Sequence, residues 1–425
     1  MNTIWIINLH SATPHTTSGH YRHYYLASKM IEKGYKVVLI KGSYTHLSED
    51  ITPSNEKYNI YSDDVEGRLK IVSVKTPKYD ANSFIGRVWN FFIFFWRVLF
   101  FKVNTLPKPS IVIVSSMPLF CVLNGVYLKW KYKFPFILEV RDIWPLTPIM
   151  IGGISKYNPF MLLLTYLEKL GYKKADLIVS TLPLLGNHIK NILPRLKYKF
   201  AYITNGFLLE KTNKNSSDDF KDTALLEKIK DKFVIGYTGT LGEANGMQYL
   251  IEAAVLLKNR VDIHFVLVGE GYKKDNLIAL SNKNNLTNIS FINKVPKKYI
   301  KWYLNQFDVC YIGWNDIPLY QFGISANKIY DYMCSAKPIL MSGNIGADPI
   351  QLAKSGKTVP PSNPDAIASA IHEFYAMNKK DLRILGDNGR KYFLENYTYN
   401  ILADKYVSVF KSLDVEPILT EEINN

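Results

Sequence analysis

Cysteine is scarce in this chain, and no stretch is a long repeat or of low complexity. The cysteines lie far apart, each in an apolar stretch and without the spacing of metal ligands: Cys121, Cys310 and Cys334. This pattern excludes a disulfide framework and indicates buried thiols in a reducing compartment. Residues 1–10 have no basic region and no small-residue cleavage site, so they predict a first buried strand and not a secretion signal.

Acidic pairs of the form Asp-x-Asp at strand ends are also missing. Two adjacent pairs, Asp63-Asp64 and Asp218-Asp219, lie in polar segments instead. Because divalent cations such as Mg²⁺ are usually held through carboxylates, the sequence predicts no bound metal. No motif points to another cofactor, and we expect none.

Positive charge, by contrast, is abundant. The 425 residues include 52 lysines and arginines against 37 acidic residues, which gives a formal net charge of +15. A nucleic acid, an anionic membrane and a phosphorylated substrate all have the matching sign. Hydrophobic residues make up 47% and charged residues 21%, which is a globular composition, and the length suits two domains of about 200 residues each.

The first half of the chain opens with the pattern of a parallel α/β sheet. An apolar run at 3–9 leads into a polar loop at 11–19, and a helical pattern over 21–33 is closed by Gly34. The next apolar run spans 36–40. This order of strand, glycine-containing loop, helix and strand is typical of doubly wound folds. Further buried strands are predicted at 110–115, 136–140 and 177–180.

The same order begins again in the second half. A strand is predicted at 233–237, a glycine-containing loop at 238–245 and a helix at 246–258. A polar stretch between the halves, 211–222, is predicted to be a linker or an exposed loop. Strands recur at 263–268, 289–292, 309–311 and 338–341.

We therefore predict an α/β protein with two doubly wound, Rossmann-like domains, at 1–195 and 200–395, followed by a C-terminal segment at 396–425. The helix of that segment, around 400–413, can cross back to the first domain. Because ligands of open α/β sheets bind at the carboxyl ends of the strands, both glycine loops are expected to face a cleft between the domains.

One helix in the first half is both basic and aromatic. On a helical projection of residues 84–103, Arg87, Asn90, Arg97 and Lys102 share an arc of roughly 140°. The remaining surface consists of Phe, Trp, Ile, Leu and Val. Such a helix has one polar and one strongly apolar face.

Three interpretations of this helix compete. A transmembrane span would have to carry two arginines within about 20 residues, which is costly. A buried core helix is the second alternative, which two arginines on one face do not exclude. A helix in an anionic membrane interface is favoured, because the chain has no Asp or Glu from 81 to 138. The residues expected at the membrane are Trp89, Phe92, Phe95, Trp96 and Arg97.

Several segments together resemble one family. They are TSGHYRHYYLASKMIEKGYKVVLI at 17–40, ILEVRDIWP at 137–145, and YTGTLGEANGMQYLIEAA at 237–254 with GISANKIYDYMCSAKPIL at 323–340. In this order they resemble the glycosyltransferase family 4 enzymes, and within them the bacterial WbuB-like transferases of surface polysaccharides. The resemblance spans nearly the whole chain and implies the GT-B fold.

The resemblance also implies a reaction. It is the retaining transfer of a sugar from a UDP-sugar to a polyprenol-diphosphate-linked acceptor, in the synthesis of O-antigen or capsule. The sugar is expected to be an N-acetylated hexosamine or deoxyhexosamine. Without a metal, cations and helix dipoles would neutralise the diphosphate. The protein is expected to be cytoplasmic and peripheral on the inner face of the cell membrane, an anionic surface, with no nucleic-acid partner.

The glycine loop of the first half is one candidate part of the site. Ser18-Gly19 precedes the first helix, where a residue without Cβ lets backbone N–H groups approach phosphate oxygens. The resemblance implies that Gly19 closes on the donor diphosphate, although a simple turn would use the same glycine. His20 and Arg22 are surface or acceptor-side groups, which the sequence does not separate.

Arg141-Asp142 is the candidate catalytic pair. It follows a predicted strand, at the place where relatives often carry His-Asp near the transferred sugar. The WbuB-like branch also has Arg there. An arginine can hold a hydroxyl or a phosphate, but it cannot act as a base. Asp142 could orient Arg141 or contact the acceptor, and a structural ion pair at the strand end is the alternative.

In the second half, Gly239, Thr240 and Asn245 occupy a loop in which many relatives carry an Arg and a Lys for the diphosphate. Neither cation is present here. Backbone N–H groups, the helix that begins near Gly246 and a cation from elsewhere must then hold the diphosphate. Lys328 is the candidate cation.

The segment 323–331 carries the strongest local signal. Relatives often have two glutamates there, and the second binds the ribose hydroxyls. Asp331 stands at the second position and Gly323 at the first, which leaves open how the transferred sugar is held. A solvated helix residue is the alternative for Asp331. The remaining candidates for donor binding are Ser325, Ala326 and Asn327, which are expected before a helix, and Lys294 and Val295, in a loop that contacts the base in relatives.

Two other functions fit parts of the sequence. A nucleotide-sugar epimerase shares the architecture but has no use for an aromatic interfacial helix, and it would act on a UDP-sugar without an acceptor. A nucleic-acid-binding module would explain the net charge but leave the donor-type loops idle, and it would show salt-sensitive duplex binding.

Overall fold

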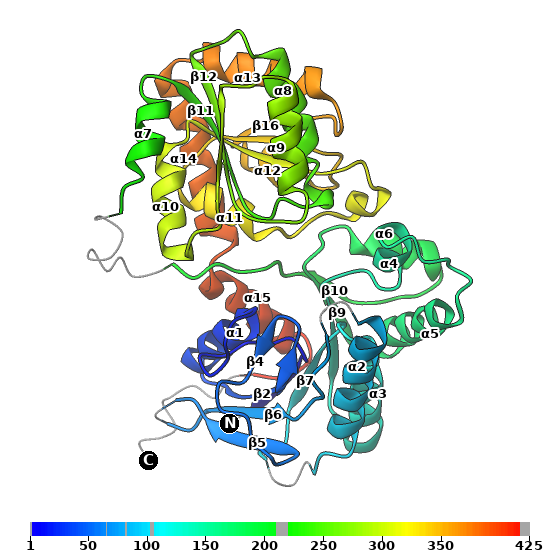
Figure 1. Ribbon diagram of the computed structural model, residues 1–425. Helices are drawn as coiled ribbons and strands as arrows, with labels where there is room; N and C mark the ends of the chain where they lie inside the picture. The colour runs from blue at the N-terminus through cyan, green and yellow to red at the C-terminus, as the bar shows by residue number, and fades with distance from the viewer. Residues whose placement is uncertain (1, 65, 81–82, 103–105, 210–219, 417–425) are drawn as a thin grey trace. The chain divides into compact units, whose positions relative to one another are not determined.

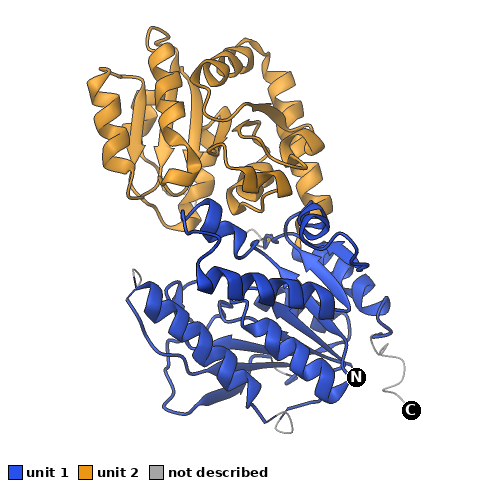
Figure 2. Cartoon of the chain, turned by 90° about the vertical axis from the view of Figure 1, so that its right-hand side faces the viewer, with its two compact units in different colours: residues 1–208, 399–425 blue, residues 209–398 orange. Residues whose placement is uncertain are grey.

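The computed structural model describes residues 2–416 apart from 65, 81–82, 103–105 and 210–219, and it comprises two compact units (Figures 1 and 2). Unit 1 is formed by Met1–Leu208 and Tyr399–Asn425, and unit 2 by Leu209–Thr398. Most of the predicted linker at 211–222 lies outside the described residues. Each unit is an α/β sandwich around one parallel sheet, as the repeated order of strands and helices predicts.

The sheet of unit 1 has the order β10-β9-β8-β7-β1-β2-β6-β5. All neighbours are parallel except β5, which is antiparallel to β6. Its strands are β1 (Thr3–Ile7), β2 (Lys36–Gly42), β5 (Tyr58–Ser62), β6 (Leu69–Val74), β7 (Ile111–Ser115), β8 (Phe136–Val140), β9 (Leu177–Ser180) and β10 (Phe200–Tyr202). A separate antiparallel pair is formed by β3 (Tyr44–Thr45) and β4 (Ser48–Glu49).

The helices of unit 1 cover both faces of this sheet (Figure 1). They are α1 (Arg22–Glu32), α2 (Phe84–Leu99), α3 (Cys121–Tyr132), α4 (Leu146–Met150), α5 (Pro159–Lys174), α6 (Leu185–Ile192) and α15 (Tyr399–Lys411). Because both faces are covered, central strands read as continuous apolar runs, and every residue of β1, β7 and β8 is buried.

Helix α15 packs on α1, so the end of the chain contributes to the core of unit 1. Leu402, Tyr406 and Phe410 recur at helical spacing and join one apolar cluster with Leu26 and Met30 of α1. Together the two helices cover the face of the sheet beside β1 and β2.

Unit 2 contains a six-stranded, fully parallel sheet in the order β13-β12-β11-β14-β15-β16. Its strands are β11 (Phe233–Thr238), β12 (Ile263–Val268), β13 (Ile289–Ile292), β14 (Val309–Gly313), β15 (Ile339–Ser342) and β16 (Gly356–Val359). Its helices are α7 (Thr223–Ile229), α8 (Met247–Leu256), α9 (Lys274–Lys283), α10 (Lys297–Gln306), α11 (Asn327–Cys334), α12 (Pro349–Ala353), α13 (Pro364–Ala376) and α14 (Lys379–Asn396), with short 3-10 helices at Glu243–Asn245 and Pro318–Phe322.

The thiols are only partly as predicted. Cys121 and Cys310 are buried, and burial raises the pKa of both. Cys334 is not a fully buried residue as predicted: it is the last residue of α11 and is half-buried, although Tyr332 and Met333 before it are buried.

Candidate functional site

The Gly19 loop of unit 1 runs from β1 to α1. Gly19 has φ +123°, and a Cβ there would lie 2.9 Å from Cβ of Ala12 and 3.1 Å from Cβ of Ser48. The loop is closed by the N–H of Ala12, which donates to the carbonyl of His20 at 3.1 Å. Glycine is therefore required at position 19 by the local backbone, and a role in phosphate binding remains a prediction.

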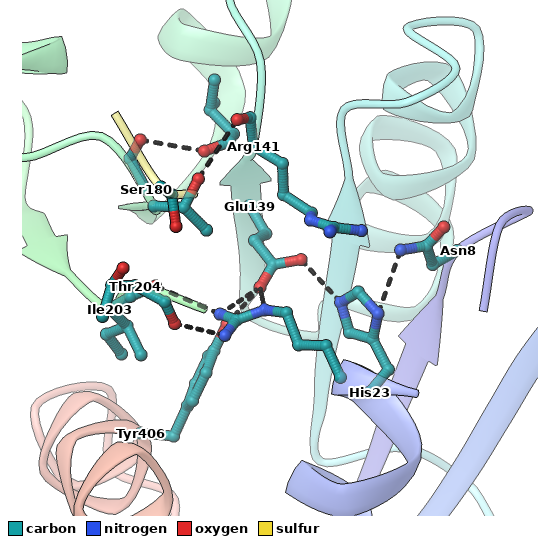
Figure 3. A network of polar contacts seen from close by, with 12 residues as sticks. Asn8, His23, Glu139, Arg141, Ser180, Ile203, Thr204 and Tyr406 are labelled. Carbon is teal, nitrogen blue, oxygen red and sulfur yellow. Dashed lines mark hydrogen bonds and ion pairs between the residues drawn. The ribbon is translucent and has the colours of Figure 1, made fainter. Parts of the chain in front are cut away.

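Directly after this loop, α1 delivers two basic side chains to a buried carboxylate on β8. Glu139 is fully buried, and its Oε1 accepts from Nη2 of Arg22 at 2.9 Å and from Nε at 3.3 Å. Tyr406 of α15 donates to the same oxygen at 2.7 Å, and Oε2 contacts Nε2 of His23 at 2.6 Å. Figure 3 shows these side chains converging on Glu139 from α1 and α15.

The proton on His23 can be placed from its neighbours. Oδ1 of Asn8 accepts from the N–H of His10 at 2.8 Å, so Nδ2 of Asn8 is the group that donates to Nδ1 of His23 at 3.0 Å. Nδ1 is then unprotonated, and Nε2–H donates to Glu139. His23 is neutral in this arrangement, in keeping with burial, which lowers its pKa.

The hydrogen-bonding capacity of Glu139 is therefore used by Arg22, His23 and Tyr406. Burial alone would raise the pKa of Glu139, but His23, Arg22 and Arg141 hold it well below its usual range. Arg22 also donates to the backbone carbonyls of Ile203, at 3.1 Å, and Thr204. A buried carboxylate thus joins the start of α1, β8 and α15 at the carboxyl end of the sheet.

The predicted catalytic pair lies just beyond this carboxylate. Arg141 is two residues after Glu139, and its carbonyl accepts from Oγ1 of Thr181 at 3.1 Å. Its buried Nε finds no hydrogen-bond partner among the described residues, and Figure 3 draws no dashed line to its guanidinium. Burial lowers the pKa of Arg141. Asp142 is exposed, and no hydrogen bond joins the two side chains in the described part of the chain.

A group of histidines surrounds Arg141, and sequence reasoning missed most of it. His10 is buried, and its ring meets those of His46 and Phe91 edge-on at 5.9 and 5.8 Å. Burial, together with His46, Arg141 and His20, lowers the pKa of His10 to about 3. The sequence did contain one signal of buried polar partners in this region. Glu139 is a charged residue inside an apolar strand, and such a residue needs partners when it is buried.

In unit 2 the structure brings Gly239, Asn245 and Lys328 together. Nζ of Lys328 donates to Oδ1 of Asn245 at 2.7 Å and to the hydroxyl of Tyr237 at 2.9 Å. It also lies 4.6 Å from the ring centre of Tyr237 and 5.8 Å from that of Trp314. Gly239 has φ +147° and its Cβ position is 3.4 Å from Nζ of Lys328. Tyr237 and Trp314 were not predicted.

Lys328 is enclosed by neutral groups. Tyr237 donates its hydroxyl proton to the carbonyl of Thr240 at 2.7 Å, and Asn245 donates to the same carbonyl at 2.9 Å, so both turn an oxygen toward the ammonium. In the described part of the chain no carboxylate pairs with it. Burial lowers its pKa to about 7. Two of its three protons are used, which leaves one donor for a ligand.

Helix α11 begins beside this lysine. Ala326 is its N-cap and provides no side-chain acceptor for the first N–H groups, and Asn327 is its first residue. Oγ of Ser325 lies 3.1 Å from the hydroxyl of Tyr330. The helix start therefore offers N–H groups and a positive dipole end next to Lys328.

Asp331 lies one turn further along α11 and is half-buried. Burial raises its pKa to about 6, and Lys297 opposes this shift. Lys297 follows the loop of Lys294, which is exposed, and Val295, which is half-buried. Asp331, the predicted ribose ligand, thus interacts electrostatically with the first residue of α10.

Comparisons with known proteins show what the chain is similar to. Residues 232–377 match the family model for glycosyl transferases group 1. The probable glycosyltransferase WbjE of Pseudomonas aeruginosa is 22% identical over 360 residues, covering 82% of this chain and 84% of the relative. An uncharacterized glycosyltransferase of Methanocaldococcus jannaschii is 25% identical, covering 90% and 98%. The O-antigen chain mannosyltransferase C of Escherichia coli is 23% identical, covering 67% and 75%.

Solved structures share the fold. Sucrose-phosphate synthase of Thermosynechococcus elongatus superposes with a TM-score of 0.69 at 16% identity, covering 97% of this chain and 99% of that one. HepE of Anabaena, in complex with UDP and glucose, has a TM-score of 0.60 at 14% identity, covering 96% and 99%. The chain is a glycosyltransferase with the GT-B fold. The fold class and the family resemblance are confirmed at this level.

The aromatic helix of this glycosyltransferase is α2. The environment of its polar face and that of Phe95 differ from the prediction. Phe95 is wrong as a membrane residue: it is buried, because its ring packs on Phe120 of the α3 start. Arg97, expected at the headgroups, donates Nη1 to the carbonyl of Lys75 and is half-buried. The polar arc thus faces the protein, where Asn90 donates to the carbonyls of Tyr44 and Pro77.

The opposite face of α2 is apolar and exposed. Trp89 and Trp96 have 54% and 48% of their surface exposed, and half-buried Phe92 stacks between them. Rings of Phe120 and Phe160 connect this helix to α5. The exposed apolar residues of the α4–α5 region are Met150, Ile151, Tyr157, Leu162, Leu163 and Tyr166. No described helix is long and apolar enough to cross a membrane.

The described residues contain no group of three or more His, Cys, Asp or Glu side chains suited to holding a metal ion. The expectation that the glycosyltransferase needs no metal therefore stays a prediction.

Proposed function

We propose that this glycosyltransferase transfers a sugar from a UDP-sugar to a polyprenol-diphosphate-linked acceptor, with retention and without a metal ion. The transferred sugar would be an N-acetylated hexosamine or deoxyhexosamine, and the product an O-antigen or capsule precursor. One observation carries the donor part of the proposal: Lys328 lies among neutral groups beside the start of α11, with no carboxylate partner in the described chain.

A diphosphate suits this position. A half-buried cation with a depressed pKa gains most from an anion, because the anion compensates the charge that burial disfavours. The N–H groups of the α11 start add donors, and Asp331 supplies a carboxylate for ribose hydroxyls. That HepE of Anabaena was solved with UDP and glucose supports the choice of donor class.

The acceptor part rests on other support. The mannosyltransferase of Escherichia coli acts on O-antigen chains, and WbjE is a probable glycosyltransferase. A lipid-linked acceptor lies in a membrane, so the enzyme must reach a bilayer surface. The exposed face of α2 and the α4–α5 region provides apolar side chains for such contact.

We further propose that this apolar face, which we call the α2–α5 face, docks on an anionic bilayer at the inner face of the cell membrane. It is defined by Phe84, Ile85, Trp89, Trp96 and Phe100 of α2 and its C-cap together with the exposed residues of the α4–α5 region. The segment from 84 to 138, which contains α2, has no acidic residue. Anionic lipids therefore meet no like charge from this segment.

The donor proposal is tested by thermal shift and calorimetry against a panel of nucleotide sugars. A true donor at 100 times its Kd stabilises the protein by about 2.7 kcal/mol. Incubation with polyprenol-diphosphate-linked acceptors should then give a product whose anomeric configuration matches the donor. If no UDP-sugar stabilises the protein while another nucleotide sugar does, the donor class is wrong.

The membrane proposal is tested with vesicles. About half of each tryptophan, or roughly 100 Å², is available for insertion, which sets an upper limit of about 2.5 kcal/mol for each. Trp89→Ser with Trp96→Ser should therefore lower binding to anionic vesicles by at least about tenfold, while Leu352→Ser, an exposed apolar residue of unit 2, serves as the control. Unchanged vesicle binding in the double variant would refute the docking face.

A further inference from the structure

Unpartnered polar atoms gather at the carboxyl ends of three adjacent strands in unit 1. Strands β1, β7 and β8 are neighbours in the sheet. Nδ1 of His10, Oγ of Ser115 and Nε of Arg141 are buried, and none has a hydrogen-bond partner among the described residues. Buried polar atoms are nearly always paired in folded proteins. Three such atoms in one region point to a ligand that supplies the missing partners.

The three groups lie at the end of their strands or just beyond it. Ser115 pairs with Glu139 across β7 and β8, so their side chains share a face. Arg141 is two residues beyond Glu139, directly after the end of β8, and the two side chains interact electrostatically. His10 lies after β1, close enough to Arg141 for the two to interact electrostatically. The three groups therefore follow three adjacent strands at the carboxyl edge of the sheet, where Figure 3 shows Arg141 close to Glu139.

The charge of this region is positive. Glu139 is already saturated by Arg22, His23 and Tyr406, so it leaves the guanidinium of Arg141 without a hydrogen-bonded carboxylate. Of the other groups that act on His10, Arg87 is cationic, whereas burial lowers the pKa values of His46 and His20. Asp142 is exposed at the rim. An anion entering here would meet a net excess of cationic side chains.

We propose that His10, Ser115 and Arg141 form a phosphate subsite in unit 1, which holds the diphosphate of the acceptor. This inference rests on the proposed function for the identity of the ligand. The guanidinium, the hydroxyl and the imidazole can all donate hydrogen bonds at once, and a phosphate offers only acceptors. The donor diphosphate is the other source of the same chemistry, and it has its own candidate site in unit 2 at Lys328.

The test uses calorimetric titration of the full chain with geranyl diphosphate, in the presence of saturating UDP so that the donor site is occupied. Ser115→Ala removes one hydrogen bond to a charged group and should weaken geranyl diphosphate binding by at least about tenfold. Arg141→Gln should weaken it more, and Arg141→Lys should restore part of the affinity. Geraniol, which lacks the diphosphate, should not bind.

Two matched controls separate binding from folding. Ser116→Ala removes the next hydroxyl, which is equally buried and also unpartnered but points to the other face by strand alternation, so it should change the affinity by less than about twofold. Arg195→Gln removes an exposed cation of unit 1 and should have no effect. Equal losses in the Ser115 and Ser116 variants would mean a general loss of packing and overturn the subsite.

The two proposals fail in different ways. UDP titrated alone into the Ser115 and Arg141 variants should bind as in the wild type. If these variants lose UDP affinity and keep geranyl diphosphate affinity, the phosphate belongs to the donor and the acceptor assignment is wrong. If no UDP-sugar binds the wild type while geranyl diphosphate does, the donor proposal fails and the subsite stands. Absence of geranyl diphosphate binding to the wild type overturns the subsite.

Discussion

The affinity for a UDP-sugar should pass through a maximum near neutral pH. Two groups of the candidate donor site must be charged for binding, and burial shifts both away from their usual ranges. The pKa of Lys328 is lowered to about 7, and that of Asp331 is raised to about 6. The lysine must be protonated to hold the diphosphate, and the aspartate must be ionised to accept from the ribose hydroxyls.

The direction of each limb follows from linkage. A bound diphosphate raises the pKa of Lys328, so affinity is lost as pH rises above the value of about 7 in the free protein. Ribose hydroxyls lower the pKa of Asp331, so affinity is lost as pH falls below about 6. One pH unit beyond either value leaves about one molecule in eleven in the competent state. Affinity should therefore fall about tenfold by about pH 8 and about tenfold by about pH 5.

Calorimetry with a UDP-sugar is the suitable assay, because both of its phosphates are esterified and neither adds a titration near neutral pH. Titrations in buffers of different ionisation enthalpy should show uptake of close to one proton at about pH 8. Lys328→Met should remove the alkaline limb, and Asp331→Asn should remove the acid limb. A flat profile in the wild type, or an alkaline limb that survives in Lys328→Met, would refute the assignment of these two residues.

Three further predictions concern single features of the molecule. Asp331→Ala should weaken UDP binding at least about tenfold at about pH 7, since each charge-assisted hydrogen bond contributes about 1.5–3 kcal/mol, whereas Asp331→Glu should retain most of the affinity in the same titration. Transferase activity should survive EDTA, and a complete loss that Mg²⁺ restores would contradict the metal-free diphosphate site. Glu139→Gln should lower the free energy of unfolding by about 3–5 kcal/mol in denaturant titrations, because Arg22 is left buried without a counter-charge, and a change below about 1 kcal/mol would contradict this.

Much of the fold is readable from the sequence because its central strands are buried on both faces. The bounds predicted for β8 and β12 are those of the structure, and each is a largely apolar run that is buried along its whole length. The helix of 84–103 was harder. Its arc of polar residues was predicted to face the lipid headgroups, but Asn90 and Arg97 donate to backbone carbonyls of the protein. Helical periodicity defines two faces and does not say which one meets the protein.

Several residues of the candidate donor site were predicted from the sequence, but the aromatic residues around Lys328 were not. Gly239, Asn245 and Lys328 were selected by resemblance and do meet. Tyr237 and Trp314, which enclose the lysine, come from the end of β11 and from beyond β14. Their approach depends on the order of strands in the sheet, which places β11 beside β14, and no local pattern encodes that order.

The network around Glu139 shows why α15, near the end of the chain, is part of unit 1. The carboxylate is buried on β8 and would be costly there without compensation. Arg22 and His23 supply part of it, and they are fixed because they open α1 directly after the Gly19 loop. Tyr406 of α15 supplies a further hydrogen bond to Glu139, although the two residues are 267 positions apart in the chain. One carboxylate thereby ties the glycine loop, the strand that ends in Arg141 and the returning helix. Displacing α15 would remove the hydrogen bond that Tyr406 donates to Oε1 of Glu139, and Arg22 would be the remaining donor to that oxygen. The returning helix therefore helps to hold the carboxylate on the strand that leads to Arg141, although it contributes no residue to the predicted site.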